Sequence, residues 1–273
     1  MLKVKVLHIV DIAGIASIIS YYQNKYDVEK SNLFFHKKND FSSTISNYYE
    51  GKSFKKFKKL LFSSLSQKND FDIIHIHSAE YLVPIFKIFG KKVVLHYHGT
   101  DIRKPKNSLD KKKIFCRSLA DMIIYNAENM LPKIITFRDI KKRYLPNPID
   151  TDLFRFTNNK KKGCISYIST SLDKEKTIGA IQDVMETEII DPSNQQIPYP
   201  MMTKLLSKYE TYLDIRITPW EQTLDELSTT ALQALACGCR VFHNQKFISD
   251  FPQKHDPKSV IEKLHSYYCE ILK

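Results

Sequence analysis

The sequence has little glycine, few cysteines and no long apolar run. Only 7 of its 273 residues are glycine, and the dinucleotide-binding pattern G-x-G-x-x-G is absent, so nothing favours a dinucleotide site. The five cysteines are odd in number and lack zinc-finger spacing, which predicts buried thiols in a reducing compartment. No apolar run reaches the ~18 residues of a transmembrane helix, and the chain starts as a strand rather than a signal peptide. We therefore expect a soluble, cytoplasmic protein.

The sequence does have a sizeable apolar content and an uneven distribution of charge. Hydrophobic residues make up 42% of the chain, enough for a buried core. Residues 1–150 carry 27 Lys and Arg against 14 Asp and Glu, whereas residues 151–273 carry 15 against 16. Such asymmetry predicts an anionic partner, which is nucleic acid, the acidic lipid head groups of a membrane or a polyanionic, phosphorylated acceptor; a merely solvated surface is the alternative. The amphipathic, lysine-rich segment 54–65 is the expected contact.

Apolar segments alternate with amphipathic ones along the first half of the chain. Strands are expected at residues 3–10, 30–35, 71–77, 92–96, 122–125 and 142–145. A loop containing Gly14 follows the first strand and leads into a helix, and further helices are expected at 54–65 and 81–89. Strands that alternate with helices in this way predict an α/β fold with a parallel sheet.

Two prolines interrupt this pattern at Pro146-Asn-Pro148 and indicate a domain boundary. Beyond it, strands are expected at 164–169, 212–217 and 240–243, and helices at 177–188, 201–209, 227–237 and 257–272. The sequence therefore predicts two Rossmann-like domains, 1–147 and 148–273, that face each other across a cleft. Ligands bind such folds at the carboxyl ends of the strands.

Polar side chains follow several of the expected strands at that edge. In the first half they are His77, His98, Asp101 and Arg103, and the loop after the first strand offers its backbone at Gly14. The imidazole and the guanidinium donate hydrogen bonds and the carboxylate accepts them, so this group suits a phosphate or a sugar hydroxyl. A histidine at a strand end is also often purely structural.

Four stretches in order give the chain a wider resemblance. They are Asp72-Ile-Ile-His-Ile-His77, Tyr97-His-Gly-Thr-Asp-Ile-Arg103, Leu145-Pro-Asn-Pro-Ile-Asp150 with Phe154, and Ala231-Leu-Gln-Ala-Leu-Ala-Cys-Gly238 before Val241. With these motifs the chain resembles a short GT-B nucleotide-sugar glycosyltransferase of the family 4 type. The resemblance implies an acceptor in the first domain, a nucleotide diphosphate sugar in the second, and transfer with retention of anomeric configuration. It implies no cofactor and no bound metal.

The resemblance also assigns roles to individual residues. The catalytic candidates are His98, Asp101 and Asp225. The donor-binding candidates are Gly14, Thr170, Lys176, Thr229, Thr230 and Gln233. The acceptor-side candidates are His77 and Arg103, with a glycan or lipid-linked molecule as the acceptor.

The second half departs from the family pattern at three points. Gln233 stands where the family has a glutamate that accepts hydrogen bonds from the ribose, and a neutral amide accepts more weakly than a carboxylate. No arginine follows the strand at 164–169, so Lys176, or Lys174 in its place, is the expected phosphate ligand. A strand and helix pair is missing between 188 and 201. A partner protein that binds a nucleotide sugar without turnover is therefore the main alternative. Nucleic-acid binding through the basic half is a third, but the sequence contains no recognised nucleic-acid-binding module, so no specific nucleic acid is expected.

Overall fold

The polypeptide folds into two compact units. The computed structural model describes residues 3–36, 45, 48–49, 51–103, 105–157, 163–168, 172–191, 197–219, 224 and 226–273. Unit 1 comprises Met1–Pro148 together with Pro257–Lys273, and unit 2 comprises Ile149–Asp256.

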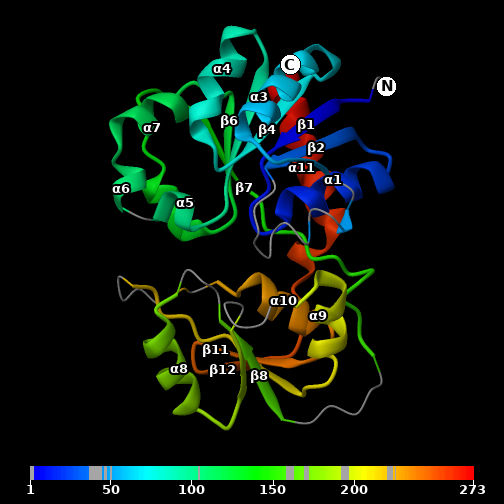
Figure 1. Ribbon diagram of the computed structural model, residues 1–273, viewed down its shortest axis with the longest axis vertical. Helices are drawn as coiled ribbons and strands as arrows, with labels where there is room; N and C mark the ends of the chain where they lie inside the picture. The colour runs from blue at the N-terminus through cyan, green and yellow to red at the C-terminus, as the bar shows by residue number, and fades with distance from the viewer. Residues whose placement is uncertain are drawn as a thin grey trace. The chain divides into compact units, whose positions relative to one another are not determined.

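Unit 1 is built on a seven-stranded parallel sheet (Figure 1). Its strands are β1 (Lys5–Ile9), β2 (Lys30–His36), β3 (Lys52–Phe54), β4 (Ile73–His77), β5 (Lys92–Tyr97), β6 (Met122–Tyr125) and β7 (Lys141–Tyr144). They lie in the order β3-β2-β1-β4-β5-β6-β7. The order reverses between β1 and β4, so the carboxyl ends of these two strands flank the point where doubly wound sheets bind ligands.

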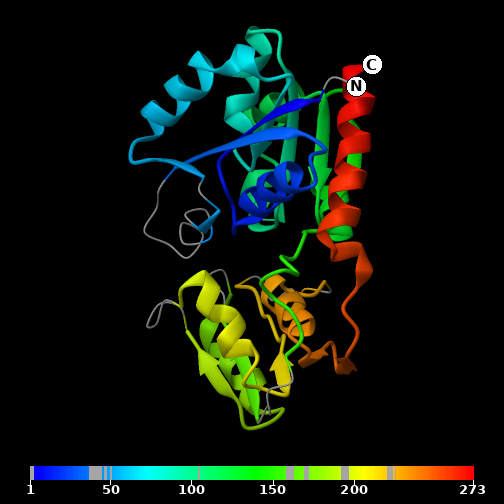
Figure 2. The same cartoon turned by 90° about the vertical axis from the view of Figure 1, so that its right-hand side faces the viewer.

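Helices cover both faces of this sheet. One face carries α1 (Ile15–Lys25) and α11 (Pro257–Leu272), which lie side by side, and the other carries α3 (Phe57–Ser66) and α4 (Val83–Ile88) (Figures 1 and 2). α7 (Lys111–Arg117) packs beside α4. The remaining turns of helix are α5 (Thr100–Arg103), α6 (Pro105–Ser108), η1 (Lys68–Asp70), η2 (Glu80–Leu82) and η3 (Glu128–Lys133).

The strands of unit 1 are buried because their side chains are apolar on both faces. Alternate residues point to opposite sides of a strand. On the face of α1 and α11 the core contains Val6, Ile73, Val94, Met122 and Ile124. On the face of α3 and α4 it contains Leu7, Ile74, Ile76, Leu95 and Ile123. Burial on both sides explains why these strands read as nearly continuous apolar runs.

The C-terminal helix belongs to unit 1, although the sequence analysis places residues 257–273 in the second domain. Its apolar stripe of Val260, Ile261, Leu264, Tyr268 and Ile271 packs on the β1 and β4 face. Arg143 of β7 donates to Glu270 over 2.7 Å. Periodicity predicts the helix and its apolar stripe correctly, but it carries no information about which of two sheets the stripe covers.

Unit 2 is built on a five-stranded sheet. Its strands are β8 (Cys164–Tyr167), β9 (Glu188–Ile190), β10 (Thr211–Leu213), β11 (Arg240–His243) and β12 (Lys246–Ile248), in the order β12-β11-β10-β8-β9. Only β12 is antiparallel to its neighbour. The helices are α8 (Lys174–Gln182), α9 (Tyr199–Leu206) and α10 (Thr229–Ala236), followed by the short η4 (Gln253–His255). The strand order reverses between β8 and β10.

The expected elements agree with the observed ones to different degrees. The strands at 122–125 and 240–243 and the helix at 257–272 have the predicted bounds. The prediction of a helix over 177–188 is wrong in part, because α8 ends at Gln182 and β9 begins at Glu188. The three-residue strands β3, β9 and β12 and the short helices α5 to α7 went unrecognised, since such segments are too short to show a period.

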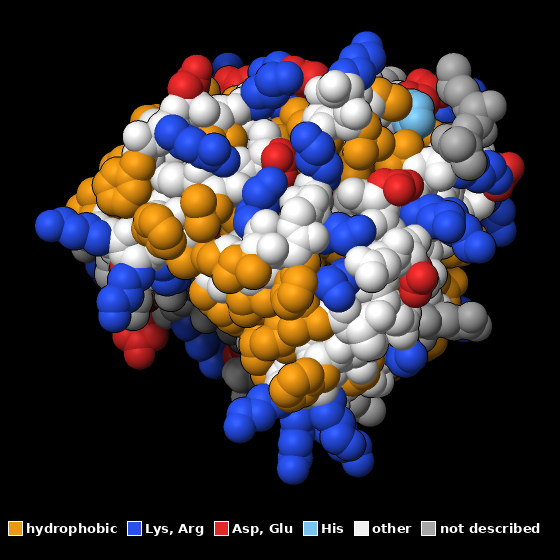
Figure 3. All heavy atoms as spheres, turned by 90° about the horizontal axis from the view of Figure 1, so that it is seen from above, with side chains coloured by type: hydrophobic (Ala, Val, Ile, Leu, Met, Phe, Trp, Pro, Cys, Tyr) orange, Lys and Arg blue, Asp and Glu red, His pale blue; other side chains and the backbone are white. Residues whose placement is uncertain are grey.

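Unit 1 exposes apolar side chains among its lysines. Phe62 of α3 is 68% exposed, and Tyr81, Ile88 and Phe89 near α4 are exposed as well. Figure 3 shows hydrophobic side chains gathered on this end of the molecule with Lys and Arg side chains around them. Among the described residues, no helix is long and apolar enough to cross a membrane.

Candidate functional site

Three loops of unit 1 meet at the carboxyl edge of its sheet. They follow β1, β4 and β5, which are neighbours in the sheet. Each contains a residue with a left-handed backbone: Val10 (φ 69°), Ser78 (φ 60°) and Gly99 (φ 146°). A β-branched valine in this conformation is strained, and such strain gathers at functional sites.

Gly14 is required by the loop after β1. It precedes α1 with φ 75°, and a Cβ atom built there would lie 2.3 Å from Ile45 Cγ2. Asp11 fixes the same turn, because its carboxylate accepts from the Ala16 N–H over 2.9 Å and from the Ser17 hydroxyl.

Gly14→Ala is expected to lower the free energy of unfolding by more than the ~1–2 kcal/mol of left-handed backbone strain, because the methyl group also displaces Ile45. Gly90→Ala is the matched control: its φ is 69° and nothing lies within 4 Å of the added Cβ. Urea unfolding of both variants measures the difference. An equal loss of unfolding free energy in the two variants would mean that contact with Ile45 is not what requires a glycine at position 14.

The loop after β5 is organised by Asp101. Its Oδ1 accepts from the Gly99 N–H at 2.7 Å and the Ile102 N–H at 3.1 Å. Its Oδ2 accepts from the His98 N–H at 2.9 Å and from the Ser78 hydroxyl. Four donors from the β4 and β5 loops thus converge on one carboxylate, which positions the backbone that carries His98.

The two acceptor-side candidates lie at different depths. Arg103 donates from Nε to Asn129 Oδ1 over 3.2 Å, which holds its guanidinium near η3. The His77 side chain is fully buried, and its Nδ1 lies 2.8 Å from His98 Nε2. His77 is therefore a neighbour of His98 within the protein.

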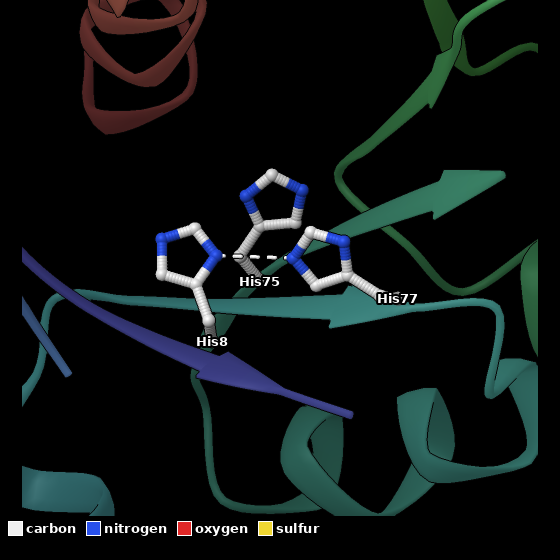
Figure 4. A group of neighbouring side chains, drawn as sticks. All are labelled: His8, His75 and His77. Carbon is white, nitrogen blue, oxygen red and sulfur yellow. Dashed lines mark hydrogen bonds between the residues drawn. The ribbon is translucent and has the colours of Figure 1, made fainter. Parts of the chain in front are cut away.

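Five histidines share one face of the sheet. His8 pairs with His75 across β1 and β4, and His77 pairs with His96 across β4 and β5. His98, two residues after His96, continues the same face, and its ring lies 4.2 Å from that of His96. On this face the amino ends of the strands carry apolar side chains and the carboxyl ends carry histidine side chains. Figure 4 shows His8, His75 and His77 side by side on β1 and β4.

Burial keeps these imidazoles neutral. It lowers the pKa of His8 to about 4, against a favourable hydrogen bond to Gln23. It also lowers the pKa of His98 to about 4, although Asp101 acts in the opposite direction. Burial and mutual repulsion hold the pKa values of His75, His77 and His96 well below the usual range. A neutral imidazole offers one donor and one acceptor.

Two subsets of this cluster have the composition of a metal site. His8, His75 and His77 form one, and His77, His96 and His98 form the other; within each subset one ring nitrogen per residue lies within 4.8 Å of the others. Imidazole nitrogen is a ligand for Zn²⁺ and similar ions. The rings of His75 and His77 are stacked, with 13° between their planes. The nitrogen lone pairs lie in the ring planes, so in two parallel rings they point in parallel directions. One ring would have to rotate before both lone pairs could point at the same ion.

Asp214 is the polar centre of the unit 2 edge. It follows β10 and accepts from the Ser228 N–H at 2.9 Å. Arg216 Nε lies 3.2 Å from its Oδ1 and His243 Nδ1 lies 3.1 Å from its Oδ2. Burial alone would raise the pKa of Asp214, but Arg216, His243 and Ser228 outweigh it and hold the pKa below its usual value. Ser228 also caps α10 by accepting from the Ala231 N–H.

The donor-side candidates of unit 2 that the structure describes lie on α8 and α10. Lys176 is in the first turn of α8, where its side chain is 51% exposed and its ammonium lies 4.0 Å from the Asp173 carboxylate. Thr229 and Thr230 form the start of α10 and are half-buried. Gln233, in the middle of α10, is only 5% exposed, so it does not face solvent. Thr170 and Asp225 lie outside the described residues.

Sequence reasoning missed Asp214, Arg216 and His243 in unit 2 and Gln23 and His8 in unit 1. Arg216 stands beside the strand reversal between β8 and β10, where its Nε pairs with Asp214 and its Nη2 is buried without a hydrogen-bond partner among the described residues. The alternation Asp214-Ile-Arg216 after an apolar strand was the available signal, because it puts both charged groups on one side.

The chain resembles known proteins over part of its sequence and over its fold. Residues 39–153 match the family model described as Glycosyltransferase Family 4. No curated protein matches the sequence.

Two solved structures share the architecture. One is UDP-GlcNAc 2-epimerase from Neisseria meningitidis bound to UDP-GlcNAc, with a TM-score of 0.51, 14% identity, and coverage of 98% of this chain and 93% of that one. The other is a glycosyltransferase from Rickettsia africae, with a TM-score of 0.50, 10% identity, and coverage of 100% and 89%. At such identities the likeness concerns the fold.

Proposed function

We propose that this chain, which has the GT-B fold and a glycosyltransferase family 4 segment over residues 39–153, transfers a sugar from a nucleotide diphosphate sugar to a glycan or lipid-linked acceptor. The observation that carries the proposal is the family match, because it spans the loop of His98 and Asp101 at the carboxyl edge of the unit 1 sheet. The transfer is proposed to retain the anomeric configuration and to need no metal or cofactor.

Unit 2 is proposed to bind the donor. Lys176 meets the diphosphate with its exposed ammonium, and Arg216 adds a guanidinium where the sequence lacks the family's arginine. Cations placed on a departing diphosphate stabilise the charge that develops there. The amide of Gln233 accepts from the ribose hydroxyls. The remaining donor contacts of unit 2 are assigned to Thr170, Thr229 and Thr230, and Asp225 is assigned to the sugar. Gly14 of unit 1 is assigned a further donor contact.

Unit 1 is proposed to bind the acceptor and to supply the reacting edge. His98 contacts substrate, and Asp101 holds the His98 backbone through the hydrogen bonds described above. His77 and Arg103 support this edge from within the fold. Leaving-group departure and acceptor attack take place on the same face of the sugar, without an enzyme nucleophile.

A thermal-shift screen against UDP, GDP, dTDP, ADP and CMP and their sugars tests the donor site. A ligand at 100 times its dissociation constant stabilises a protein by about 2.7 kcal/mol. Lys176→Ala is expected to raise that dissociation constant roughly 10- to 100-fold, since a hydrogen bond to a charged group contributes about 1.5–3 kcal/mol. Lys204→Ala, another exposed helical lysine of unit 2, is the control. No stabilisation by any nucleotide would refute the donor site.

Turnover separates the enzyme from the alternative. The neutral Gln233 favours a protein that binds a nucleotide sugar without transferring it, because an amide accepts more weakly than a carboxylate. Release of free nucleotide only when an acceptor extract is added supports the transferase. Binding without release supports the non-catalytic partner, and salt-sensitive binding to any duplex without a nucleotide response supports a polyanion-binding protein.

Unit 1 is further proposed to rest on an anionic membrane through α3. The exposed Phe62 lies among the lysines of that helix, and such a pairing suits a negatively charged lipid surface. The protein is expected to sediment with vesicles containing phosphatidylglycerol but not with pure phosphatidylcholine vesicles. Phe62→Ser is expected to weaken this binding. Equal sedimentation with both vesicle types would argue against the proposal.

A further inference from the structure

A continuous chain of hydrogen bonds runs through the imidazole cluster of unit 1. Gln23 Oε1 lies 2.8 Å from His8 Nε2, and His8 Nδ1 lies 3.0 Å from His77 Nε2. His77 Nδ1 lies 2.8 Å from His98 Nε2. Gln23, His8 and His77 are fully buried, so no solvent competes for these contacts.

Each link of this chain determines the next. A neutral imidazole has one N–H and one lone pair, so a ring that accepts at one nitrogen must donate from the other. Because burial keeps all of these rings neutral, the direction of donation is the same along the whole chain. One end therefore fixes the tautomer at the other end.

Gln23 sets that direction. Its amide nitrogen lies 3.5 Å from the Tyr268 hydroxyl, and the side chain lies close enough to the buried Glu29 carboxyl to lower the pKa of that carboxyl. Burial raises the pKa of Glu29, and His265 and Gln23 offset part of this rise, as expected of donors. With its N–H groups on that side, Gln23 presents its carbonyl oxygen to His8.

We infer that Gln23, His8 and His77 are positioning residues that fix His98 with its proton on Nε2 and its lone pair on Nδ1. The carbonyl of Gln23 accepts from His8 Nε2–H, His8 Nδ1 accepts from His77 Nε2–H, and His77 Nδ1 accepts from His98 Nε2–H. His98 Nδ1 is left without a hydrogen-bond partner among the described residues.

The direction of these hydrogen bonds decides which kind of substrate group can bind His98 in the proposed reaction. To that extent the inference rests on the proposed function. A lone pair accepts a hydrogen bond from a hydroxyl group, whereas the diphosphate of a nucleotide sugar has no proton to offer near neutral pH. Nδ1 is buried in this structure, so the side chains around it must move before it binds substrate, and the group that it then binds is a hydroxyl from either the donor sugar or the acceptor.

The ring tautomers are measured directly by long-range ¹H–¹⁵N correlation of the histidine-labelled full chain near neutral pH. His98→Gln identifies the His98 signals by their loss. The expected result is a protonated Nε2 and an unprotonated Nδ1. A protonated Nδ1 on His98, or an imidazolium, would overturn the inference. One equivalent of metal in the purified protein would also overturn it, because the ion would occupy the lone pairs of the hydrogen-bonded imidazole rings.

Two variants test the positioning role. Gln23→Met removes the acceptor and is expected to mix the two tautomers of His98. His96→Gln removes a ring of the same cluster that takes no part in this series of hydrogen bonds. It is expected to leave the His98 tautomer unchanged. An unchanged His98 tautomer in Gln23→Met would show that Gln23 does not set the direction. None of these readouts requires activity, so failure of the proposed transferase leaves them interpretable.

The hydroxyl assignment is tested with the nucleotide that stabilises the protein in the thermal screen. The His98 Nδ1 signal is expected to stay in place on adding that nucleotide alone. It is expected to move on adding the nucleotide sugar if the donor supplies the hydroxyl, or only on further addition of acceptor extract if the acceptor does. A shift with the bare nucleotide, or no shift with the complete mixture, would refute the assignment.

Discussion

The free energy of unfolding is expected to fall steeply as the pH is lowered from about 6.5 to about 4. In the native protein burial holds the pKa of His8 and of His98 at about 4, whereas both titrate near 6.5 in an unfolded chain. Below pH 6.5 these histidines are therefore protonated in the unfolded state but remain neutral in the native state. Stability that is fully present above pH 6.5 is lost progressively down to the native pKa.

The loss is large compared with the stability of an ordinary domain. A shift of one pKa unit corresponds to about 1.4 kcal/mol. The protonation of His8 and of His98 in the unfolded state therefore each lowers the free energy of unfolding by about 3 kcal/mol over this interval. His75, His77 and His96 act in the same direction. A typical native protein has only about 5–15 kcal/mol in total, and unit 1 is therefore expected to unfold before pH 4 is reached.

Urea unfolding at stepped pH measures this dependence. His8→Asn is expected to reduce the slope of stability against pH by about one proton, or ~1.4 kcal/mol per pH unit. Val260→Ala, which removes a buried apolar group of α11 and no titratable group, is expected to lower the free energy of unfolding without changing its slope against pH. A stability of unit 1 that stays level between neutral pH and pH 4.5 would disprove the neutral, buried cluster.

Asp214→Ala is expected to destabilise unit 2 by about 3–5 kcal/mol. The substitution leaves the Arg216 guanidinium, whose side chain is 14% exposed, without its counter-charge. It also removes the acceptor of the Ser228 N–H at the start of α10 and the partner of His243. Breaking one side of a buried ion pair is costly because the other charge remains in the low-dielectric interior.

Urea unfolding followed by far-ultraviolet circular dichroism measures this loss. Asp173→Ala is the control: Asp173 caps α8 through a single bond to the Lys176 N–H at 3.3 Å, and its removal is expected to cost about 1 kcal/mol. Asp214→Ala with Arg216→Met removes both charges and is expected to recover part of the stability. If Asp214→Ala costs no more than Asp173→Ala, Asp214 does not hold this edge together.

The sequence by itself determined the two sheets of mainly parallel strands, the break at Pro146–Pro148, and the loops that carry His98 and Asp101. These features follow from local pattern, since apolar runs between helical segments form buried parallel strands whose ends lie at one edge. The same local reasoning identified the α11 helix from end to end, because its apolar stripe recurs at the helical period.

Only the tertiary structure decided which faces meet. The spacing of His75 and His77 shows that they share a side of β4, but the strand order β1-β4-β5 is what adds His8 and His96 to the same surface. The packing of α11 on unit 1 and the pairing of Arg216 with Asp214 depend likewise on segments that the fold brings together. Periodicity is a property of one element, whereas burial, pKa and hydrogen-bond direction arise between elements that are distant in the chain.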